Sequence, residues 1–142
     1  MPKLSCVLLV DDDPTNNFLS QRLLKRLDVA QQVLVAENGQ QALDLLAAAG
    51  TVPTPPFPAL ILLDVQMPVM NGIEFLHAYQ QLPAHQRQAT TVVVLTTSSD
   101  ARDLAQLQAL PVTTHLNKPL TLEKLKSVLK LHYEHHPKVG EH

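Results

Sequence analysis

Short apolar runs alternate with amphipathic stretches along most of the chain. The runs cover residues 4–10, 32–36, 60–63, 91–95 and 112–116. Short uninterrupted apolar runs are typical of strands that are buried on both faces of a parallel sheet. Each run is followed by a stretch whose apolar residues recur at helical spacing. The alternation predicts five strands and five helices in a doubly wound, three-layer α/β fold with a parallel sheet.

The segments outside this alternation are polar or rich in proline. Residues 51–58 contain four prolines, a density that neither a helix nor a central strand tolerates. We interpret them as a stiff, extended connector, and a proline-rich ligand for a partner domain is the alternative. Residues 83–89 are predicted to be a polar loop. We expect one domain over residues 4–132 and a polar, fraying tail over residues 133–142.

Composition narrows the class of protein. The chain has 142 residues, 45% of them hydrophobic, and a formal net charge of −2. This suits one globular domain, and without a basic run the chain is not expected to bind nucleic acid. The single cysteine, Cys6, lies in the first apolar run and is interpreted as a core residue of a protein in a reducing compartment. With neither a signal peptide nor a membrane span in the sequence, we expect a cytoplasmic protein.

Polar side chains of complementary kinds stand at the ends of four predicted strands. They are Asp11 and Asp12 after the first strand, Asp64 at the third, Thr96 at the fourth and Lys118 after the fifth. Parallel strands end at one edge of the sheet, and ligands bind beyond that edge. Converging carboxylates favour Mg²⁺, which suits phosphoryl groups, and a lysine and a hydroxyl can hold phosphoryl oxygens. We interpret the set as a phosphorylatable aspartate with its metal and counter-charges.

Each member of this set also has a simpler interpretation. The run of three acids before Pro14 could cap a helix, Lys118 could belong to an ordinary turn, and Thr96 could only continue a strand. The joint pattern is more specific than any part of it. Asp13, the additional acid, is assigned to helix capping.

These residues resemble the motifs of the receiver domain of two-component response regulators. The resemblance covers about residues 4–132 and rests on Val10-Asp11-Asp12-Asp13-Pro14, Leu63-Asp64-Val65-Gln66-Met67-Pro68, Asn71-Gly72, Leu95-Thr96-Thr97 and Asn117-Lys118-Pro119. It implies the flavodoxin-like strand order 2-1-3-4-5, which the chemotaxis member of this family has. It also implies a stand-alone regulator that acts in phosphorelay signal transduction.

The resemblance assigns a metal site to the ends of the first and third predicted strands. Asp12 and Asp64 would bind Mg²⁺ directly, and Mn²⁺ could substitute for it. The backbone carbonyl of Gln66 would be the third protein ligand. Asp11 would support the ion, through water.

The resemblance also assigns the phosphoryl group and its donor. Asp64 would be the phosphoacceptor and would attack a phosphohistidine on a histidine kinase or a histidine phosphotransfer protein. Thr96 would bind one phosphoryl oxygen and Lys118 would pair with another. The Lys118-Pro119 peptide is expected to be cis. Phosphorylation would then alter contacts between an unidentified downstream protein and the surface of the fifth strand and its two flanking helices.

Three residues depart from the family pattern. His115 stands where a tyrosine or phenylalanine is usual, and that aromatic residue switches together with the counterpart of Thr96. Thr96 and His115 are therefore the expected switch residues, with a different readout as the alternative. A role of the imidazole in pH sensing is the weaker hypothesis, because a partly exposed histidine usually has no such role. Thr97 and Thr114 replace smaller residues, and the bulk of Thr97 could slow entry of the phosphodonor.

Several other functions compete with this hypothesis. A degenerate receiver that only binds proteins, independently of phosphorylation, is the main alternative. Phosphohydrolases of the aspartyl-phosphate type usually need a second acid at the position of Gln66, which weakens that hypothesis. A flavodoxin-like cofactor binder is disfavoured because the triply acidic first turn would repel a phosphate group. We expect a phosphoacceptor, not an enzyme, that is a monomer or a weak dimer.

Histidines near the C-terminus raise the question of a second metal site. His132 and His136 have the i, i+4 spacing of a helix, and His135 and His142 lie nearby. Closed metal sites need four defined ligands, so a solvated tail is the favoured interpretation. His77 and His85 lack the helical-bundle context of a phosphotransfer histidine.

Overall fold

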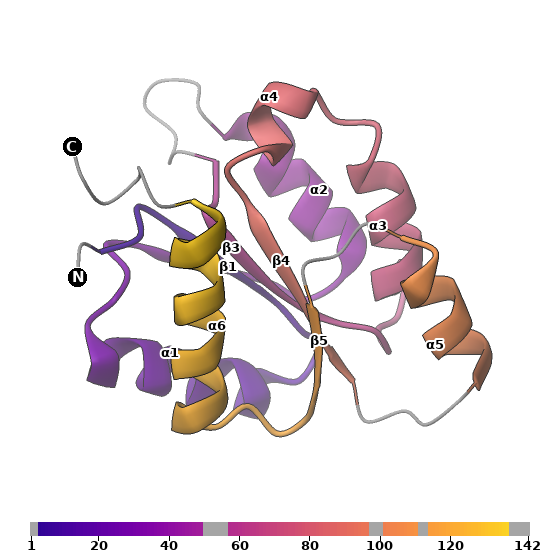
Figure 1. Ribbon diagram of the computed structural model, residues 1–142. Helices are drawn as coiled ribbons and strands as arrows, with labels where there is room; N and C mark the ends of the chain where they lie inside the picture. Colours follow the sequence, from indigo (N-terminus) through magenta and orange to yellow (C-terminus); the bar gives the residue numbers. More distant parts are fainter. Residues whose placement is uncertain (1–2, 50–56, 97–100, 111–113, 137–142) are drawn as a thin grey trace.

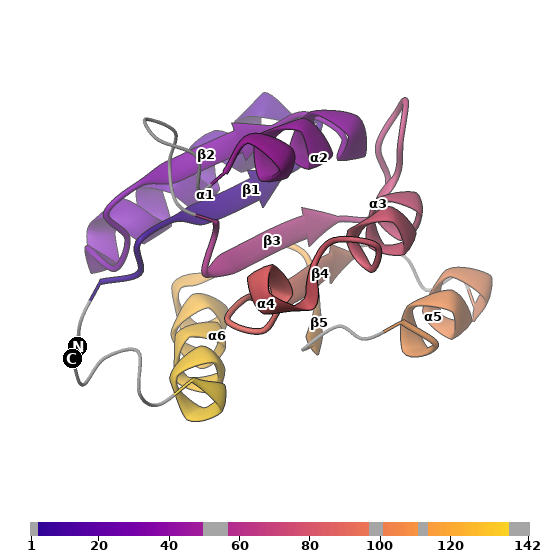
Figure 2. The same cartoon turned by 90° about the horizontal axis from the view of Figure 1, so that it is seen from above.

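The computed structural model describes residues 3–49, 57–96, 101–110 and 114–136. Its parallel sheet has the strands β1 (Val7–Val10), β2 (Val33–Ala36), β3 (Leu60–Asp64), β4 (Thr91–Thr96) and β5 (Thr114–Asn117). The strand order is β2-β1-β3-β4-β5 (Figures 1 and 2). Both the parallel sheet and its order are confirmed. β1 and β2 begin later than their apolar runs, and β3, β4 and β5 each end one residue later. Residues 111–113 lie outside the described part.

Helices cover both faces of the sheet. They are α1 (Pro14–Leu27), α2 (Gly39–Ala48), α3 (Gly72–Tyr79), α4 (Ala84–Arg87), α5 (Ala101–Gln108) and α6 (Leu122–His135). In Figure 1, α1 and α6 lie on one side of the sheet, and α2, α3 and α5 lie on the other. In the described part of the chain, no helix is long and apolar enough to span a membrane.

The apolar runs fill two cores, one on each face of the sheet. Alternate strand residues point to opposite faces, so β1 buries Leu8 and Val10 in one cluster and Val7 and Leu9 in the other. The runs are uninterrupted because both faces are covered. Cys6 is fully buried in this region, as expected, and burial raises the pKa of its thiol to about 11.

The loop predicted for residues 83–89 is corrected by the structure. It contains the short helix α4, so the part of the chain that the structure describes has six helices where five were expected. The guanidinium of Arg87 bonds back to the carbonyl oxygen of Leu82, 2.9 Å from Nε, and to the side chain of Gln80. A single polar turn that one side chain holds has no hydrophobic periodicity, so the pattern could not reveal it.

The interpretation of the C-terminal histidines is also corrected in part. α6 continues to His135, and His132 is completely buried where a solvated tail was favoured. It follows Leu125, Val128 and Leu129 on the apolar stripe of α6, which turns it toward the sheet. Its Nδ1 lies 2.7 Å from Oγ1 of Thr91. Burial, and then the nearby His136 and His135, lower the pKa of His132 to about 4, so its ring is neutral at physiological pH.

Polar caps set the starts of the helices that flank the strand ends. The Asp13 side chain accepts a hydrogen bond from the backbone N–H of Thr15 at 2.8 Å, which confirms its assignment as a helix cap. Asn71 and Glu74 form a reciprocal capping box at the start of α3. Residues 51–56 of the proline-rich connector and residues 97–100, which include Thr97, lie outside the described residues.

Candidate functional site

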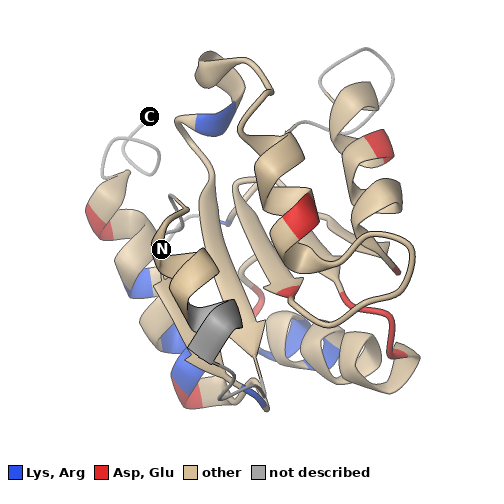
Figure 3. Cartoon of the chain, turned by 90° about the vertical axis from the view of Figure 1, so that its right-hand side faces the viewer, with Lys and Arg blue, Asp and Glu red and all other residues tan. Residues whose placement is uncertain are grey.

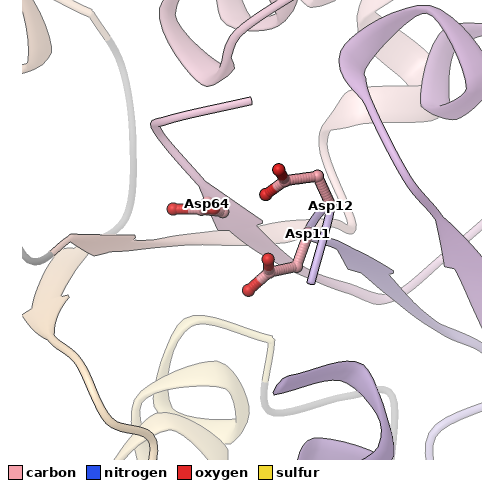
Figure 4. A group of neighbouring side chains, drawn as sticks. All are labelled: Asp11, Asp12 and Asp64. Atoms are coloured by element: carbon pink, nitrogen blue, oxygen red, sulfur yellow. The ribbon is translucent and has the colours of Figure 1, made fainter. Parts of the chain in front are cut away.

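Three aspartates meet where β1 and β3 end. Val10 and Leu63 are register partners in these adjacent parallel strands, so Asp11 and Asp64 emerge side by side. Asp12 joins them, and one carboxylate oxygen from each residue lies within 4.8 Å of the others (Figure 4). Asp11 and Asp64 are buried and Asp12 is exposed. The chain thus presents a carboxylate cluster that is open to solvent on one side.

Lys118 reaches this cluster from the end of β5. Its Nζ lies 2.9 Å from Oδ2 of Asp11 and 3.2 Å from Oδ1 of Asp64. The backbone N–H of Lys118 donates to the carbonyl oxygen of Thr96 at 2.9 Å, which ties the lysine to the end of β4. The Lys118-Pro119 peptide is cis, as expected. The structure therefore brings together all five strand-end residues that the sequence singled out.

The charges in the cluster are incompletely balanced. Burial, and to a smaller extent the charge of Asp11, raise the pKa of Asp64, although Lys118 opposes the shift. Burial by itself would lower the pKa of Lys118, but its contacts with Asp11 and Asp64 outweigh burial and raise it. In the described part of the chain, the ammonium group of Lys118 contacts two of the three carboxylates, those of Asp11 and Asp64. A hard divalent cation would complete the balance, because carboxylate oxygens are the ligands that Mg²⁺ prefers.

Backbone and amide groups of the first turn hold Asp11 in place. The backbone N–H of Asp13 donates to Oδ1 of Asp11 at 2.9 Å, and the Asn16 amide donates to Oδ2 at 3.3 Å. The buried Asn17 side chain donates to the backbone carbonyl of Asp11 at 2.8 Å. Sequence reasoning missed both asparagines. The available signal was a polar residue at position 17, on the face of α1 that packs against the sheet.

The β3–α3 loop is held in place by close backbone contacts. Gly72 donates its N–H to the carbonyl oxygen of Val65 at 2.9 Å, and Gly39 donates to that of Met70, also at 2.9 Å. The exposed Gln66 donates its backbone N–H to Oδ1 of Asp64 at 3.4 Å. These bonds position the chain directly after the acidic cluster.

Comparison with known proteins gives this geometry a context. A family model described as the response regulator receiver domain matches residues 7–130. The chain is 34% identical to response regulator Rcp1 of Synechocystis over 84% of this chain and 80% of Rcp1. A solved two-component response regulator of Cytophaga hutchinsonii superposes with a TM-score of 0.78 at 29% identity, covering 93% of this chain and 98% of that one.

The chain belongs to the response regulator receiver family. Receiver domains are signalling phosphoacceptors of two-component systems, not enzymes in the ordinary sense, and their partners are histidine kinases and phosphotransfer proteins. Receiver domains bind Mg²⁺. A solved Mn²⁺-bound form of Rcp1 superposes on this chain with a TM-score of 0.68 at 30% identity, and the match covers 91% of this chain and 92% of Rcp1. The three-aspartate cluster of this receiver is an oxygen-rich site that fits such an ion.

The two expected switch residues of the receiver lie on neighbouring strands. Thr96 is buried at the end of β4, and His115 is exposed in β5. His115 is the register partner of Val94, so it lies on the face of the sheet that α2, α3 and α5 cover. Thr114, the other unusual residue of this strand, is half-buried.

Val69 in the β3–α3 loop has an unfavourable backbone conformation. Its φ is 65°, and its side chain is 81% exposed. A β-branched residue pays a steric penalty at positive φ, whereas asparagine tolerates that region. We expect Val69→Asn to stabilise the domain by about 1 kcal/mol, which corresponds to roughly 3 °C in a thermal melt.

The same chemical change elsewhere supplies the control for Val69→Asn. Val35 in β2 is also exposed, but its φ is not positive. Val35→Asn should therefore lower the melting temperature, because asparagine is disfavoured in strands. Equal shifts in the two variants would contradict a conformational penalty at Val69.

Proposed function

We propose that Asp64 of this receiver accepts a phosphoryl group from the phosphohistidine of a histidine kinase or phosphotransfer protein. A carboxylate oxygen of Asp64 would form the new bond to phosphorus while the bond from phosphorus to the imidazole nitrogen breaks. The imidazole would leave with that electron pair. The observation that supports this most is the position of Asp64, buried at a strand end beside two further carboxylates and Lys118.

A divalent ion would be held by the acidic cluster. Asp12 and Asp64 are proposed as direct ligands together with the backbone carbonyl of Gln66, and Asp11 as a support through water. Bound Mg²⁺ would neutralise charge on the phosphoryl oxygens. The donors present fit it, because three carboxylates converge and, among the described residues, Lys118 is the one cation that pairs with them. Mn²⁺ prefers the same oxygen ligands.

Lys118 and Thr96 are proposed to hold the phosphoryl oxygens. Lys118 Nζ already lies 3.2 Å from the accepting carboxylate, so it can pair with a phosphoryl oxygen attached there. Thr96 is buried at the end of β4, adjacent to β3. We propose that Thr96 and the exposed His115 then change together and alter the surface of α5, β5 and α6. A downstream protein would read that surface.

The phosphoacceptor proposal is tested by intact-mass measurement after incubation with acetyl phosphate. We expect a gain of one phosphoryl group in the presence of Mg²⁺ and its loss when the metal is chelated, because the uncompensated carboxylates repel the phosphodonor. A mass that never increases, with acetyl phosphate and with a phosphorylated donor protein alike, would contradict the proposal. The chain would then be a binding module that works without phosphorylation.

An apolar surface of α1 beside the cluster suits a protein donor. Phe18 and Leu19 are 57% and 50% exposed. Leu19 lines a cavity of about 330 Å³ together with Asp11, Lys118 and Leu120. Figure 3 shows lysines and arginines along α1 and α6, and Arg22 of α1 contacts the Phe18 ring at 5.8 Å from its centroid. We propose that the donor protein packs here and thereby brings its phosphohistidine to Asp64.

Phe18→Ser is expected to slow phosphoryl transfer from a donor protein without affecting transfer from a small-molecule donor. Loss of an exposed aromatic anchor from an interface costs about 2 kcal/mol, so transfer from a phosphorylated donor protein should slow by roughly thirtyfold. Labelling by acetyl phosphate should not change. Val35→Ser removes an exposed apolar side chain from β2 and is the matched control, for which we expect normal rates. Equal slowing with both donors would mean that Phe18 supports the site itself.

A further inference from the structure

A second group of potential ligands lies at the opposite end of the sheet from the aspartates. His132 contacts Thr91, the first residue of β4, whereas Asp64 and Thr96 lie at the ends of their strands. His132 also lines a cavity of about 530 Å³ with His85 and Thr90. Nothing in the phosphoacceptor site involves this region. It is therefore available for a separate function.

His132 has a buried nitrogen without a hydrogen-bond partner. The residue is completely buried and its Nδ1 lies within hydrogen-bond distance of the Thr91 hydroxyl, but no donor or acceptor of the described residues reaches its Nε2. An unsatisfied polar atom in the interior loses its hydrogen bond to water without gaining another, which destabilises the folded state. Natural proteins seldom retain such a cost without a compensating partner.

The ring of His136 lies at the distance from the ring of His132 that binding to a common metal ion would require. The backbone N–H of His136 donates to the carbonyl oxygen of His132 at 2.9 Å, so the two residues keep the helical i, i+4 relation. Their ring centroids are 4.8 Å apart with planes inclined by 39°. With metal–nitrogen bonds of about 2.1 Å, two imidazoles on one tetrahedral ion have centroids roughly 5 Å apart. The observed spacing matches that value.

We propose that His132 and His136 form a two-histidine site for a transition-metal ion of the zinc class, with water in the remaining positions. Nε2 of His132 would be one ligand and a ring nitrogen of His136 the other. His136 is half-buried at the end of α6, so the ion can enter from solvent. The residues His-x-x-x-His on one helix face recur in zinc proteins because this spacing places both rings on the same ion.

Thr91 would act as a positioning residue for this site. Metal-binding histidines usually donate their second ring N–H to an oxygen, which fixes the tautomer and the ring orientation. Here Nδ1 of His132 lies 2.7 Å from the hydroxyl oxygen of Thr91. If that nitrogen carries the proton, the lone pair of Nε2 is free for a metal.

The two sites of the molecule differ in the ions that they prefer. The aspartate cluster offers only oxygen ligands, which suit Mg²⁺ and Mn²⁺, whereas imidazole nitrogens suit Zn²⁺, Ni²⁺ and Cu²⁺. An excess of Mg²⁺ should therefore saturate the aspartates and leave the histidines to Zn²⁺. This difference allows the histidine site to be measured separately in the intact chain.

The test is a calorimetric titration of the full chain with Zn²⁺ in excess Mg²⁺, accompanied by nitrogen-15 NMR of the imidazoles. We expect one Zn²⁺ to bind and to shift the ring nitrogens of His132 and His136. In His136→Gln, which leaves the core intact, the affinity should fall at least tenfold. His135→Gln changes the neighbouring exposed histidine of the same turn and should bind Zn²⁺ as the wild type does.

Three results would overturn the proposal. They are the absence of Zn²⁺ binding in excess Mg²⁺, equal affinities of the wild type and His136→Gln, and shifts of other histidines while those of His132 stay constant. Because His132→Asn could fail to fold, it is measured only together with a thermal melt. Zn²⁺ should raise the melting temperature of the wild type, since an ion that binds the folded state stabilises it, and should not raise that of His136→Gln.

Discussion

Asp64→Asn is expected to abolish phosphorylation of the receiver. An amide lacks the anionic oxygen that attacks phosphorus, and it is a poorer ligand for a hard cation. Incorporation from acetyl phosphate should fall by more than about 100-fold, to the background of the intact-mass measurement. The asparagine has nearly the shape of the aspartate, so the end of β3 should keep its conformation.

The melting temperature of Asp64→Asn shows whether the variant fails to be phosphorylated because the carboxylate is missing or because the fold is disturbed. Burial and the charge of Asp11 raise the pKa of Asp64, so at neutral pH the ionised carboxylate costs stability when no ion is bound. A raised acid pKa means that this cost develops as the pH rises above 3.8. The variant should therefore melt at or above the wild-type temperature near pH 7 in chelator.

An acid remote from the site supplies the control for Asp64→Asn. Asp44→Asn alters an exposed acid of α2 that contacts only Gln40 among the hydrogen bonds of the described residues, and it should leave phosphorylation unchanged. If Asp64→Asn still gains a phosphoryl group at the wild-type rate, another carboxylate is the acceptor. Peptide mapping would then identify Asp11 or Asp12.

Gly72→Ala is expected to destabilise the domain more than Gly39→Ala does. A Cβ on Gly72 would lie 2.5 Å from the carbonyl oxygen of Asp64 and 2.9 Å from Cα of Val65. Both are backbone atoms, so α3 would have to move away from the end of β3. Overpacking of this kind costs roughly 1–3 kcal/mol, and we expect the upper end. The midpoint of a urea denaturation measures the loss.

The displacement caused by Gly72→Ala should also disturb the phosphoacceptor. Shifts of about 1 Å in a positioned reactive group can slow a reaction about 100-fold, so labelling by acetyl phosphate should be much slower even where the variant is folded. Gly39→Ala provides the graded comparison. Its Cβ would meet the flexible side chain of Met70 as well as the Met70 carbonyl oxygen, so part of the strain can be relieved. A larger loss in Gly39→Ala than in Gly72→Ala would contradict the backbone argument.

The alternation of apolar runs and amphipathic stretches was sufficient to predict the class of the fold. A run such as Leu60–Leu63 can satisfy its side chains only when both faces of the strand are covered, and this requires helices on each side. The strand order itself came from the family resemblance, because periodicity contains no information about which strands are neighbours. The structure confirms both.

The convergence of the site residues could also be predicted, but not how they contact one another. Asp11, Asp64 and Lys118 were expected on one edge because parallel strands end together. Their ion pairs, and the asparagines that support Asp11, depend on side-chain directions that a linear sequence does not specify. The roles of these residues as acceptor, metal ligands and counter-charge remain predictions that the experiments above address.

The sequence by itself therefore determined the alternating elements and the edge at which the polar residues meet, because both follow from local spacing and from the geometry of parallel strands. Only the tertiary structure decided the environment of His132. Its own side chain is polar, yet the rotation of α6 directs it against Thr91 of β4, 41 residues away in the chain. Burial of that kind arises from packing between distant segments, which local pattern cannot express.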